Sequence, residues 1–414
     1  MLRKYPLCSR CLGRLFAKYG LGINNLVRGN AIKVAALMEI HRMISKDIKY
    51  VELLREVLPN VGIMPQLYLK YLGTKVNKVK CYICSSDLDL LISELSSKIL
   101  SRMSGFKVRN FVVSVPRGSE MERRELEVVT EFNLDSWESI RRELKRELGK
   151  KVKALLNIEP EFKYPDLIIR VDLNTLEPEI QVTPTYVLCR YVKIGRYISQ
   201  TKWVSRNGSR KYMLSLEDLV EALANSLGVS RYKMHLTGRE DVDVRILGSG
   251  RPLVIELKDM KDKTISVASL SKFVGSNRWV DLVIDRYVTP KHIIGIKLGR
   301  YSALYRVLAL SKKSLSDDAV DLLSREFSGR EVKQVLIRRV GSMRKKFTRI
   351  GKVYAVRGRL INEYVLELLI KCDSKLFIRE LVSGDEGNTS PSFAKTLGTG
   401  LEVLEVDLLD VIMD

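Results

Sequence analysis

Two pairs of cysteines constrain the N-terminal part of the chain more than any other feature. Cys8 and Cys11 form one C-x-x-C pair and Cys81 and Cys84 form another, with residues 12–80 between them. Four thiolates in a tetrahedron suit Zn²⁺, and metal-bound sulfurs of one pair lie ~3.7 Å apart. We expect both pairs to converge on one structural zinc ion, with no position open for water. The alternative is a set of small buried or redox-active cysteines.

The remaining cysteines and the N-terminus indicate a cytoplasmic protein. Cys189 and Cys372 are single residues in apolar, strand-like sequence, and we expect both in the core. Polar residues such as Arg10 and Arg14 lie where a secretory signal would need an apolar core. No apolar run approaches the ~20 residues of a membrane helix. We therefore expect no disulfide framework and no membrane segment.

The charge of the chain predicts a polyanionic partner. Lysine and arginine number 71 against 49 acidic residues, for a net charge of +22. A hydrophobic content of 45% excludes a disordered chain. The solvated surface of a heat-adapted protein would explain many charges, but not the excess of one sign. Nucleic acid is the partner that the balance favours.

The order of helical and strand-like patterns predicts an α+β protein with three regions. Residues 1–84 are expected to form a zinc-binding helical module, and residues 85–204 an α/β module with a mixed sheet. Residues 205–414 are richer in strands. The polar stretch 206–210 is interpreted as the linker before this last region. Two capping boxes predict helices, one at Asp135 to Glu138 and one at Ser215 to Asp218.

An acidic segment between Gly238 and Lys258 is the main candidate for chemistry. It is interpreted as two strands joined by a turn at residues 248–252. The period of two in a strand would place Asp241, Asp243 and Arg245 on one face. Glu256 would then lie across the hairpin, and so many acids in one place need cations, a metal or a function to offset their repulsion.

The spacing of these residues is compatible with two functions. It is also compatible with an ordinary solvent-exposed face whose charges form salt bridges. One aspartate could act as nucleophile or base on a flipped nucleotide. Alternatively, Asp243, Glu256 and Lys258 could form the D…E-x-K set of a Mg²⁺-dependent nuclease.

The same segment resembles the signature of a known family. Gly238-Arg239-Glu240-Asp241-Val242-Asp243-Val244-Arg245, with Leu247-Gly248-x-Gly250-Arg251-Pro252, is similar to the tenth pseudouridine synthase family of archaea and eukaryotes. The resemblance covers nearly the whole chain. It implies a zinc module with Cys8, Cys11, Cys81 and Cys84 as ligands, a THUMP-like RNA-binding domain, and a catalytic domain with a mixed, mainly antiparallel sheet. Arg190-Tyr191-x-Lys193 and Gln200-Thr201-x-Trp203 resemble the end of the THUMP region.

The resemblance also implies roles for individual residues. Arg239-x-Asp241 resembles the R-x-D motif, which makes Asp241 the expected catalytic residue. Tyr305-Arg306 resembles the element whose tyrosine stacks on the target base. Phe377-Ile378-Arg379-Glu380, followed by Gly384-Asp385-x-Gly387-x-Thr389-x-Pro391-Ser392, resembles the basic motif, so Arg379 is expected to pair with Asp241 and lower its pKa. The chain departs from the family at Ala303, where lysine is common, and at Phe377, where tyrosine is common.

The implied substrate is tRNA, at U54, U55 or both in the T-loop, and no organic cofactor or obligate protein partner is expected. Affinity should come mainly from phosphate contacts, with Arg239 and the basic run as candidates. That run consists of Arg338, Arg339, Arg344, Lys345, Lys346 and Arg349. A third function, a non-catalytic tRNA-binding factor, is also compatible with the charge and the cysteines.

Overall fold

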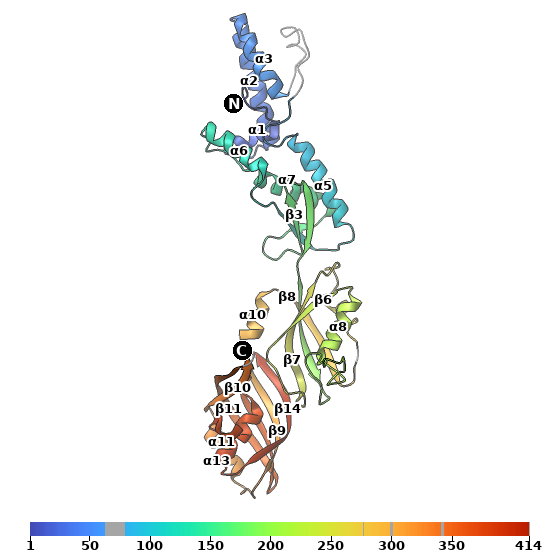
Figure 1. Ribbon diagram of the computed structural model, residues 1–414, viewed down its shortest axis with the longest axis vertical. Coiled ribbons are helices and arrows are strands. Elements are labelled where there is room, and N and C mark those ends of the chain that lie inside the picture. The colour runs from blue at the N-terminus through green and yellow to red at the C-terminus, as the bar shows by residue number, and fades with distance from the viewer. Residues whose placement is uncertain (63–78, 276, 299–300, 341–342, 414) are drawn as a thin grey trace. The chain divides into compact units, whose positions relative to one another are not determined.

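The computed structural model describes residues 1–62, 79–275, 277–298, 301–340 and 343–413 (Figure 1). Side chains of residues 336–340, 343–345 and 413 lie outside this description. The chain divides into two compact units. Unit 1 comprises Met1–Thr183 with Lys261–Thr264, and unit 2 comprises Pro184–Met260 with Ile265–Asp414. The α+β class expected from the sequence is confirmed. In the described ranges, no helix is long and apolar enough to cross a membrane.

Unit 1 combines helices with a small mixed sheet. Its helices are α1 (Ser9–Leu15), α2 (Asn25–Ile44), α3 (Val51–Val61), α5 (Leu88–Met103), α6 (Glu120–Glu131) and α7 (Ile140–Leu156), with a 3₁₀ turn η1 (Ile48–Tyr50). The sheet order is β2 (Glu159–Pro160), β1 (Asn110–Ser114), β3 (Leu167–Asp172) and β4 (Glu177–Val182). The β1–β3 pair is parallel and the β3–β4 pair is antiparallel, so the predicted mixed sheet is confirmed.

Capping explains where two of the helices begin. The predicted capping box at Ser215 and Asp218 is present at the start of α8 (Leu216–Ser226) in unit 2. The box predicted at Asp135 and Glu138 is wrong, because α7 begins at Ile140 with Ser139 as its N-cap. The side chain of Glu138 instead accepts a hydrogen bond from Asn25.

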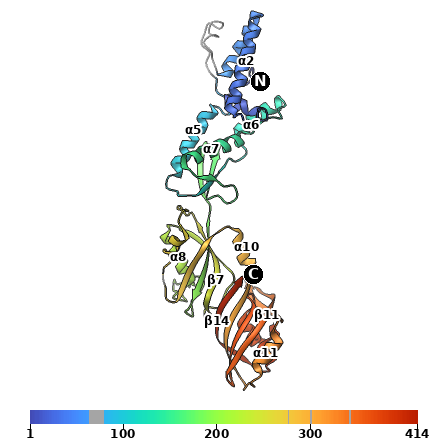
Figure 2. The ribbon, with the colours of Figure 1, turned by 180° about the vertical axis from the view of Figure 1, so that it is seen from behind.

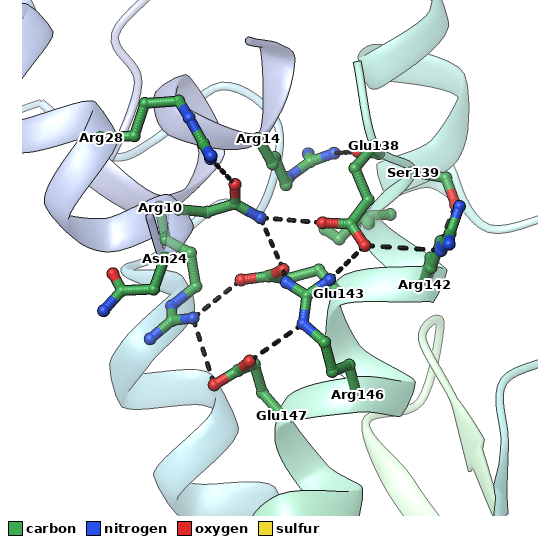
Figure 3. A network of polar contacts seen from close by, with 12 residues as sticks. Arg10, Arg14, Asn24, Arg28, Glu138, Ser139, Arg142, Glu143, Arg146 and Glu147 are labelled. Atoms are coloured by element: carbon green, nitrogen blue, oxygen red, sulfur yellow. Dashed lines mark hydrogen bonds and ion pairs between the residues drawn. The ribbon is translucent and has the colours of Figure 1, made fainter. Parts of the chain in front are cut away.

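A buried polar network joins α1 and α2 to α7 (Figure 3), and a buried ion pair joins α1 to α6. The guanidinium of Arg14 pairs with Glu125, and both side chains are almost fully buried. The Glu125 carboxylate also accepts the backbone N–H of Ile140 at 3.0 Å, which satisfies a donor at the start of α7. Arg10 donates to Glu143 at 2.7 Å. These contacts fix α1, which carries Cys11, against the α/β part of the unit.

Unit 2 is built on one ten-stranded sheet, seen from the other side in Figure 2. Its strands are β5 (Thr185–Lys193), β6 (Arg231–Leu236), β7 (Arg245–Lys258), β8 (Val280–Val288), β9 (Tyr301–Ser311), β10 (Glu331–Val340), β11 (Met343–Asn362), β12 (Val365–Asp373), β13 (Thr389–Ser390) and β14 (Leu401–Met413). Strand order is β13-β10-β11-β12-β9-β14-β7-β5-β8, with β6 on β7. Among the described pairs of this sheet, β14–β7 is parallel and the others are antiparallel, which confirms the predicted mixed, mainly antiparallel sheet.

Short helices accompany the sheet of unit 2. They are α8, α9 (Val267–Ser271), α10 (Lys291–Leu298), α11 (Ala319–Phe327), α12 (Ile378–Ser383) and α13 (Phe393–Thr396). The core of this unit includes Cys189 and Cys372, both fully buried as predicted. Helix α8 buries its predicted apolar face, including Leu219, Val220 and Leu223.

The hairpin predicted within residues 238–258 does not form. Residues 245–258 are one continuous strand, β7, and Asp241 and Asp243 lie in the loop before it. Gly248 and Gly250 have positive φ angles of 58° and 78° inside this strand rather than in a turn. A side chain at Gly248 would meet the Leu409 carbonyl oxygen of β14 at 2.1 Å. The two glycines therefore allow neighbouring strands to approach closely. Sequence alone does not distinguish such glycines from those of a turn.

The boundary between the units also differs from the one expected. Strand β5 pairs with β7 and β8 in unit 2, so residues 185–204 belong there and not with the α/β module. The polar stretch 206–210 is the end of a small hairpin in the same unit, because Val204 bridges Arg210. The boundary proposed at residue 84 remains a prediction.

We expect Arg14→Met to destabilise unit 1 by about 3–5 kcal/mol, because it leaves the Glu125 carboxylate buried without its cation. Thermal unfolding followed by circular dichroism measures this loss. Arg42→Met is the matched control, because Arg42 pairs with Glu39 on the surface. Equal unfolding temperatures for the two variants would contradict a stabilising role for the buried pair.

Candidate active site

A cavity of about 820 Å³ lies in unit 2 beside the loop that joins β6 to β7. The loop, Thr237–Val244, contributes Arg239 and Asp241 to its wall. Tyr305 from β9 and Arg379 from α12 line the same cavity. Four residues that the sequence singled out in three separate motifs are therefore brought together. Other lining residues include Arg251, Lys297, Tyr301, Arg349, Phe377 and Glu380.

Arg379 contacts both acids of the loop. Its Nε lies 3.7 Å from Asp241 Oδ2, and its Nη2 hydrogen bonds to Asp243 Oδ2. Its other terminal nitrogen, Nη1, donates to the carbonyl of Val403 at 2.9 Å, which fixes the guanidinium. The side chain of Asp241 keeps 62% of its exposure and that of Asp243 keeps 30%. Asp241 is thus the more exposed of the two acids, and Asp243 is the one paired more closely with Arg379.

The pKa of Asp241 is shifted in the direction opposite to the sequence expectation. Partial burial at the cavity raises the pKa of Asp241 above 3.8, and the nearby charge of Asp243 raises it further. Arg379 lowers that pKa, as expected, but the other effects outweigh it. Arg379 gives its hydrogen bond to Asp243 and approaches Asp241 only to 3.7 Å, which limits its effect on the pKa of Asp241.

Beneath the loop, a buried ion cluster is centred on Glu240. The Glu240 side chain is only 5% exposed and accepts hydrogen bonds from Arg251 Nη1 at 3.0 Å and from the Tyr191 hydroxyl at 2.8 Å. Gln200 donates to the same carboxylate oxygen, and Lys193 Nζ lies 3.8 Å from the other oxygen, Oε1. A buried carboxylate with this many donors holds its part of the chain in one position.

Lys193 and Arg196 hold the main chain of Asp241 and of the two residues that follow it. Lys193 Nζ is buried and donates to the carbonyl oxygens of Asp241 at 3.4 Å and Val242 at 3.2 Å. Arg196 donates to the carbonyl of Asp243 at 2.6 Å. Burial lowers the pKa of Lys193, opposed by the charge of Glu240. Both cations therefore act on the loop's backbone.

The structure places some of these supporting residues in a different part of the chain's fold than the sequence predicted. The resemblance attributed Tyr191, Lys193 and Gln200 to the end of the THUMP region, whereas they lie in unit 2 under the candidate loop. The signal that could have found them is the lysine at position 193 within an apolar strand, since a buried lysine needs a partner.

A second buried acid, Asp407 of β14, joins three strands beside the site. Its side chain is 1% exposed and pairs with Arg196 at 2.9 Å, Arg245 at 2.6 Å and Arg306 at 3.2 Å. These arginines lower the pKa of Asp407 against the effect of burial. Arg245, expected on one face with Asp241, is instead turned to Asp407. Arg306 of the Tyr-Arg element also pairs with Glu367 at 2.7 Å.

Tyr305 belongs both to the core of unit 2 and to the cavity wall. It is a buried residue of the β9 core, and it also borders the cavity. Burial raises the pKa of Tyr305 well above its usual value, so the ring stays neutral. On another part of the wall, the guanidinium of Arg349 lies over the ring of Phe377, 5.0 Å from its centroid. This cation–π contact needs only the aromatic ring, so it does not depend on the hydroxyl that Phe377 lacks.

The nuclease arrangement is wrong for this structure. Asp243 precedes β7 and Glu256 lies near the far end of that strand, tens of ångströms away at ~3.3 Å per residue. Glu256 lies 2.8 Å from the His235 ring, and Lys258 lies 3.9 Å from Glu256. The three residues therefore do not surround one ion.

The basic run lies on the β10–β11 hairpin. Arg338 is in register with Lys345, and Arg339 with Arg344. The side chains of these residues lie outside the described part of the structure. Lys346 is exposed, and Arg349 reaches the cavity.

The four paired cysteines of unit 1 converge as predicted. The sulfur atoms of Cys8, Cys11, Cys81 and Cys84 all lie within 4.8 Å of one another, and all four residues are buried. Cys8 caps α1, and its sulfur accepts the backbone N–H of Cys11 at 3.4 Å. The Cys8 and Cys84 sulfurs are 3.9 Å apart, close to the spacing of thiolates on one tetrahedral ion. The cluster fits a metal ion, and its all-sulfur donor set suits zinc.

Comparison with known proteins gives matches along nearly the whole chain. Residues 186–412 match the family described as Pus10, C-terminal, and residues 95–172 match the Pus10 THUMP domain, archaeal. A tRNA pseudouridine synthase Pus10 of Ignisphaera aggregans is 34% identical over 417 residues, 99% of this chain and 97% of that protein. The protein of the same name from Thermosphaera aggregans is 34% identical, over 99% of this chain and 94% of its own length.

Two further similarities complete the comparison. The tRNA pseudouridine synthase Pus10 of Vulcanisaeta distributa is 35% identical over 99% of this chain and 98% of its own length. A solved structure described as a Cbf5-Nop10-Gar1 complex covers 54% of this chain and 48% of that chain at 13% identity. Its TM-score of 0.30 is too low to bear on function.

Because Arg379 contacts both aspartates, substitutions at Asp243 and at Arg379 should shift the pKa of Asp241 in opposite directions. In the intact protein the pKa of Asp241 should exceed 3.8. Asp243→Asn should lower the pKa of Asp241, because it removes a like charge and releases Arg379 to pair with Asp241. Arg379→Gln should raise it. Carbon-13 NMR titration of the aspartate carboxyls, assigned with Asp241→Asn, measures both shifts. An Asp241 pKa that is the same in both variants would contradict this electrostatic coupling.

Proposed function

The chain belongs to the Pus10 family, and on that premise we propose that it isomerises uridine to pseudouridine in tRNA at the cavity of unit 2. The main support is the convergence of Asp241, Tyr305 and Arg379 on that one cavity. Coming from distant parts of the sequence, these are the residues to which the family resemblance gives catalytic roles. The surrounding buried ion pairs give the loop the rigidity that catalysis needs.

We assign the central chemical role to Asp241. In the reaction the bond from C1′ to N1 of uracil breaks and a bond from C1′ to C5 forms, while the proton of C5 is lost and N1 gains one. No redox change occurs and no organic cofactor is needed. The target nucleotide must leave its stack to enter the cavity, where Tyr305 would face the base. Arg379 would orient Asp241 and favour its ionised form.

The substrate is proposed to be the T-loop of tRNA, at U54, U55 or both, bound in the cytoplasm. Support for a tRNA partner comes from the net charge of +22 and from the names of the relatives. Arg239 beside the cavity and the basic run on β10 and β11 would contact phosphates. No obligate protein partner is proposed.

The cysteine cluster is proposed to hold structural zinc. Cys8, Cys11, Cys81 and Cys84 would fill all four positions, so the ion would join α1 to the segment before α5 and take no part in the reaction.

Asp241→Asn should reduce isomerisation at least about 10²-fold without weakening tRNA binding, because the amide can neither attack nor accept a proton. The assay incubates an unmodified tRNA transcript with enzyme in buffer without magnesium, followed by chemical mapping of pseudouridine. Asp317→Asn, at an exposed aspartate, is the matched control. An active Asp241→Asn variant would overturn the assignment, and an inactive wild type would overturn the function.

Cys81→Ser should abolish stoichiometric zinc binding and lower the unfolding temperature of the protein, since one of four ligands is lost. Metal content by mass spectrometry should be one zinc per chain for the wild type. Cys372→Ala, at a cysteine buried in β12 outside the cluster, should retain its zinc. Equal zinc content in the two variants would argue against the site.

A further inference from the structure

A small hairpin precedes α8 in unit 2, in the region first interpreted as a linker. The backbone N–H of Lys211 donates to the Trp203 carbonyl at 2.9 Å, and Val204 bridges Arg210. The side chain of Asn207 accepts the backbone N–H of Ser209 across the turn. The base of the hairpin is tied to α8, since Glu217 accepts the backbone N–H of Lys202 at 2.7 Å. This segment is therefore an ordered part of the unit.

The hairpin presents an aromatic ring with a cation over part of it. Trp203 is 51% exposed. Tyr212 holds its ring edge to face, with centroids 6.2 Å apart. Lys211 Nζ lies 5.3 Å from the Trp203 ring centre and 5.5 Å from that of Tyr212. The indole is thus fixed in place while much of its surface is open to solvent.

Trp203 and Lys211 line a second cavity, of about 500 Å³, that shares one lining residue with the candidate active site. Its lining comprises Thr201, Lys202, Trp203, Val204, Ser205, Lys211 and Arg239. Arg239 also lines the larger cavity that contains Asp241, two positions along the loop. A chain molecule with one unit at Asp241 could therefore place an adjoining unit at Trp203.

The charges of this second cavity favour an anion. Lys202 is neutralised by Glu221 and lies 3.5 Å from Asp218. Among the residues that the structure describes, neither Lys211 nor Arg239 has an acidic side chain in ion-pair contact. Two cations without acidic partners, beside an open indole, match the two parts of a nucleotide: phosphate and base.

We propose that this second cavity binds the nucleotide adjoining the target uridine, with its base stacked on Trp203 and its phosphate between Lys211 and Arg239. The inference rests on the proposed function, because it takes the target uridine to lie at Asp241. It assigns a role in substrate positioning to Trp203, and the shared Arg239 would hold the phosphate that links the two nucleotides.

The test measures binding separately from catalysis. Fluorescence anisotropy with a labelled, unmodified tRNA transcript gives the dissociation constant, and single-turnover assays give the rate of isomerisation. Trp203→Ala should weaken binding about tenfold or more, whereas Trp203→Phe should keep most of it, because phenylalanine still stacks. Lys211→Gln should weaken binding and reduce its salt dependence. Tyr364→Ala, at an exposed aromatic of the β11–β12 turn, is the matched control.

Transcripts with an abasic site on either side of the target uridine identify the contact. If Trp203 stacks on a neighbouring base, one abasic transcript should bind the wild type and Trp203→Ala equally, because the contact is already absent. The idea is overturned if Trp203→Ala binds intact transcript as the wild type does, or if the loss persists on both abasic transcripts. An inactive wild type would refute the proposed function while leaving this binding test readable.

Discussion

The candidate site depends on the burial of Glu240 with its cations. A carboxylate that is 5% exposed, next to buried Arg251 and Lys193, is stable only because each charge has a partner. That cluster lies directly below Asp241 and fixes the backbone from which Asp241 projects. Asp241 itself can then remain accessible and without an exclusive partner.

The sheet of unit 2 brings the rest of the site to this loop. Strand β14 runs parallel to β7 and antiparallel to β9, so Asp407 can pair with Arg245 of β7 and Arg306 of β9. Tyr305, next to Arg306 in sequence, points to the other side of β9 and borders the cavity. One strand thus supplies a structural cation on one face and a cavity residue on the other. The continuous β7 separates Glu256 from this site.

Unit 1 also depends on a buried ion pair, which here holds the helix that carries Cys11. Arg14 and Glu125 form a buried ion pair, and Arg14 also approaches the sulfur of Cys11 at 3.8 Å. The cysteine cluster therefore lies next to a buried cation, which would offset part of the negative charge of four thiolates around a zinc ion. This polar core holds α1 in the register that the cysteine cluster requires.

The sequence by itself determined the fold class, the cysteine cluster and the residues at the cavity, because spacing, period and family motifs are local properties. It did not determine the course of β7, since Gly248 and Gly250 suit either a turn or a close strand contact. Nor did it reveal the roles of Lys193, Arg196 and Glu240, or the sharing of Arg379 between Asp241 and Asp243. Those depend on which distant charges meet in a low-dielectric interior, and only the tertiary structure decides that.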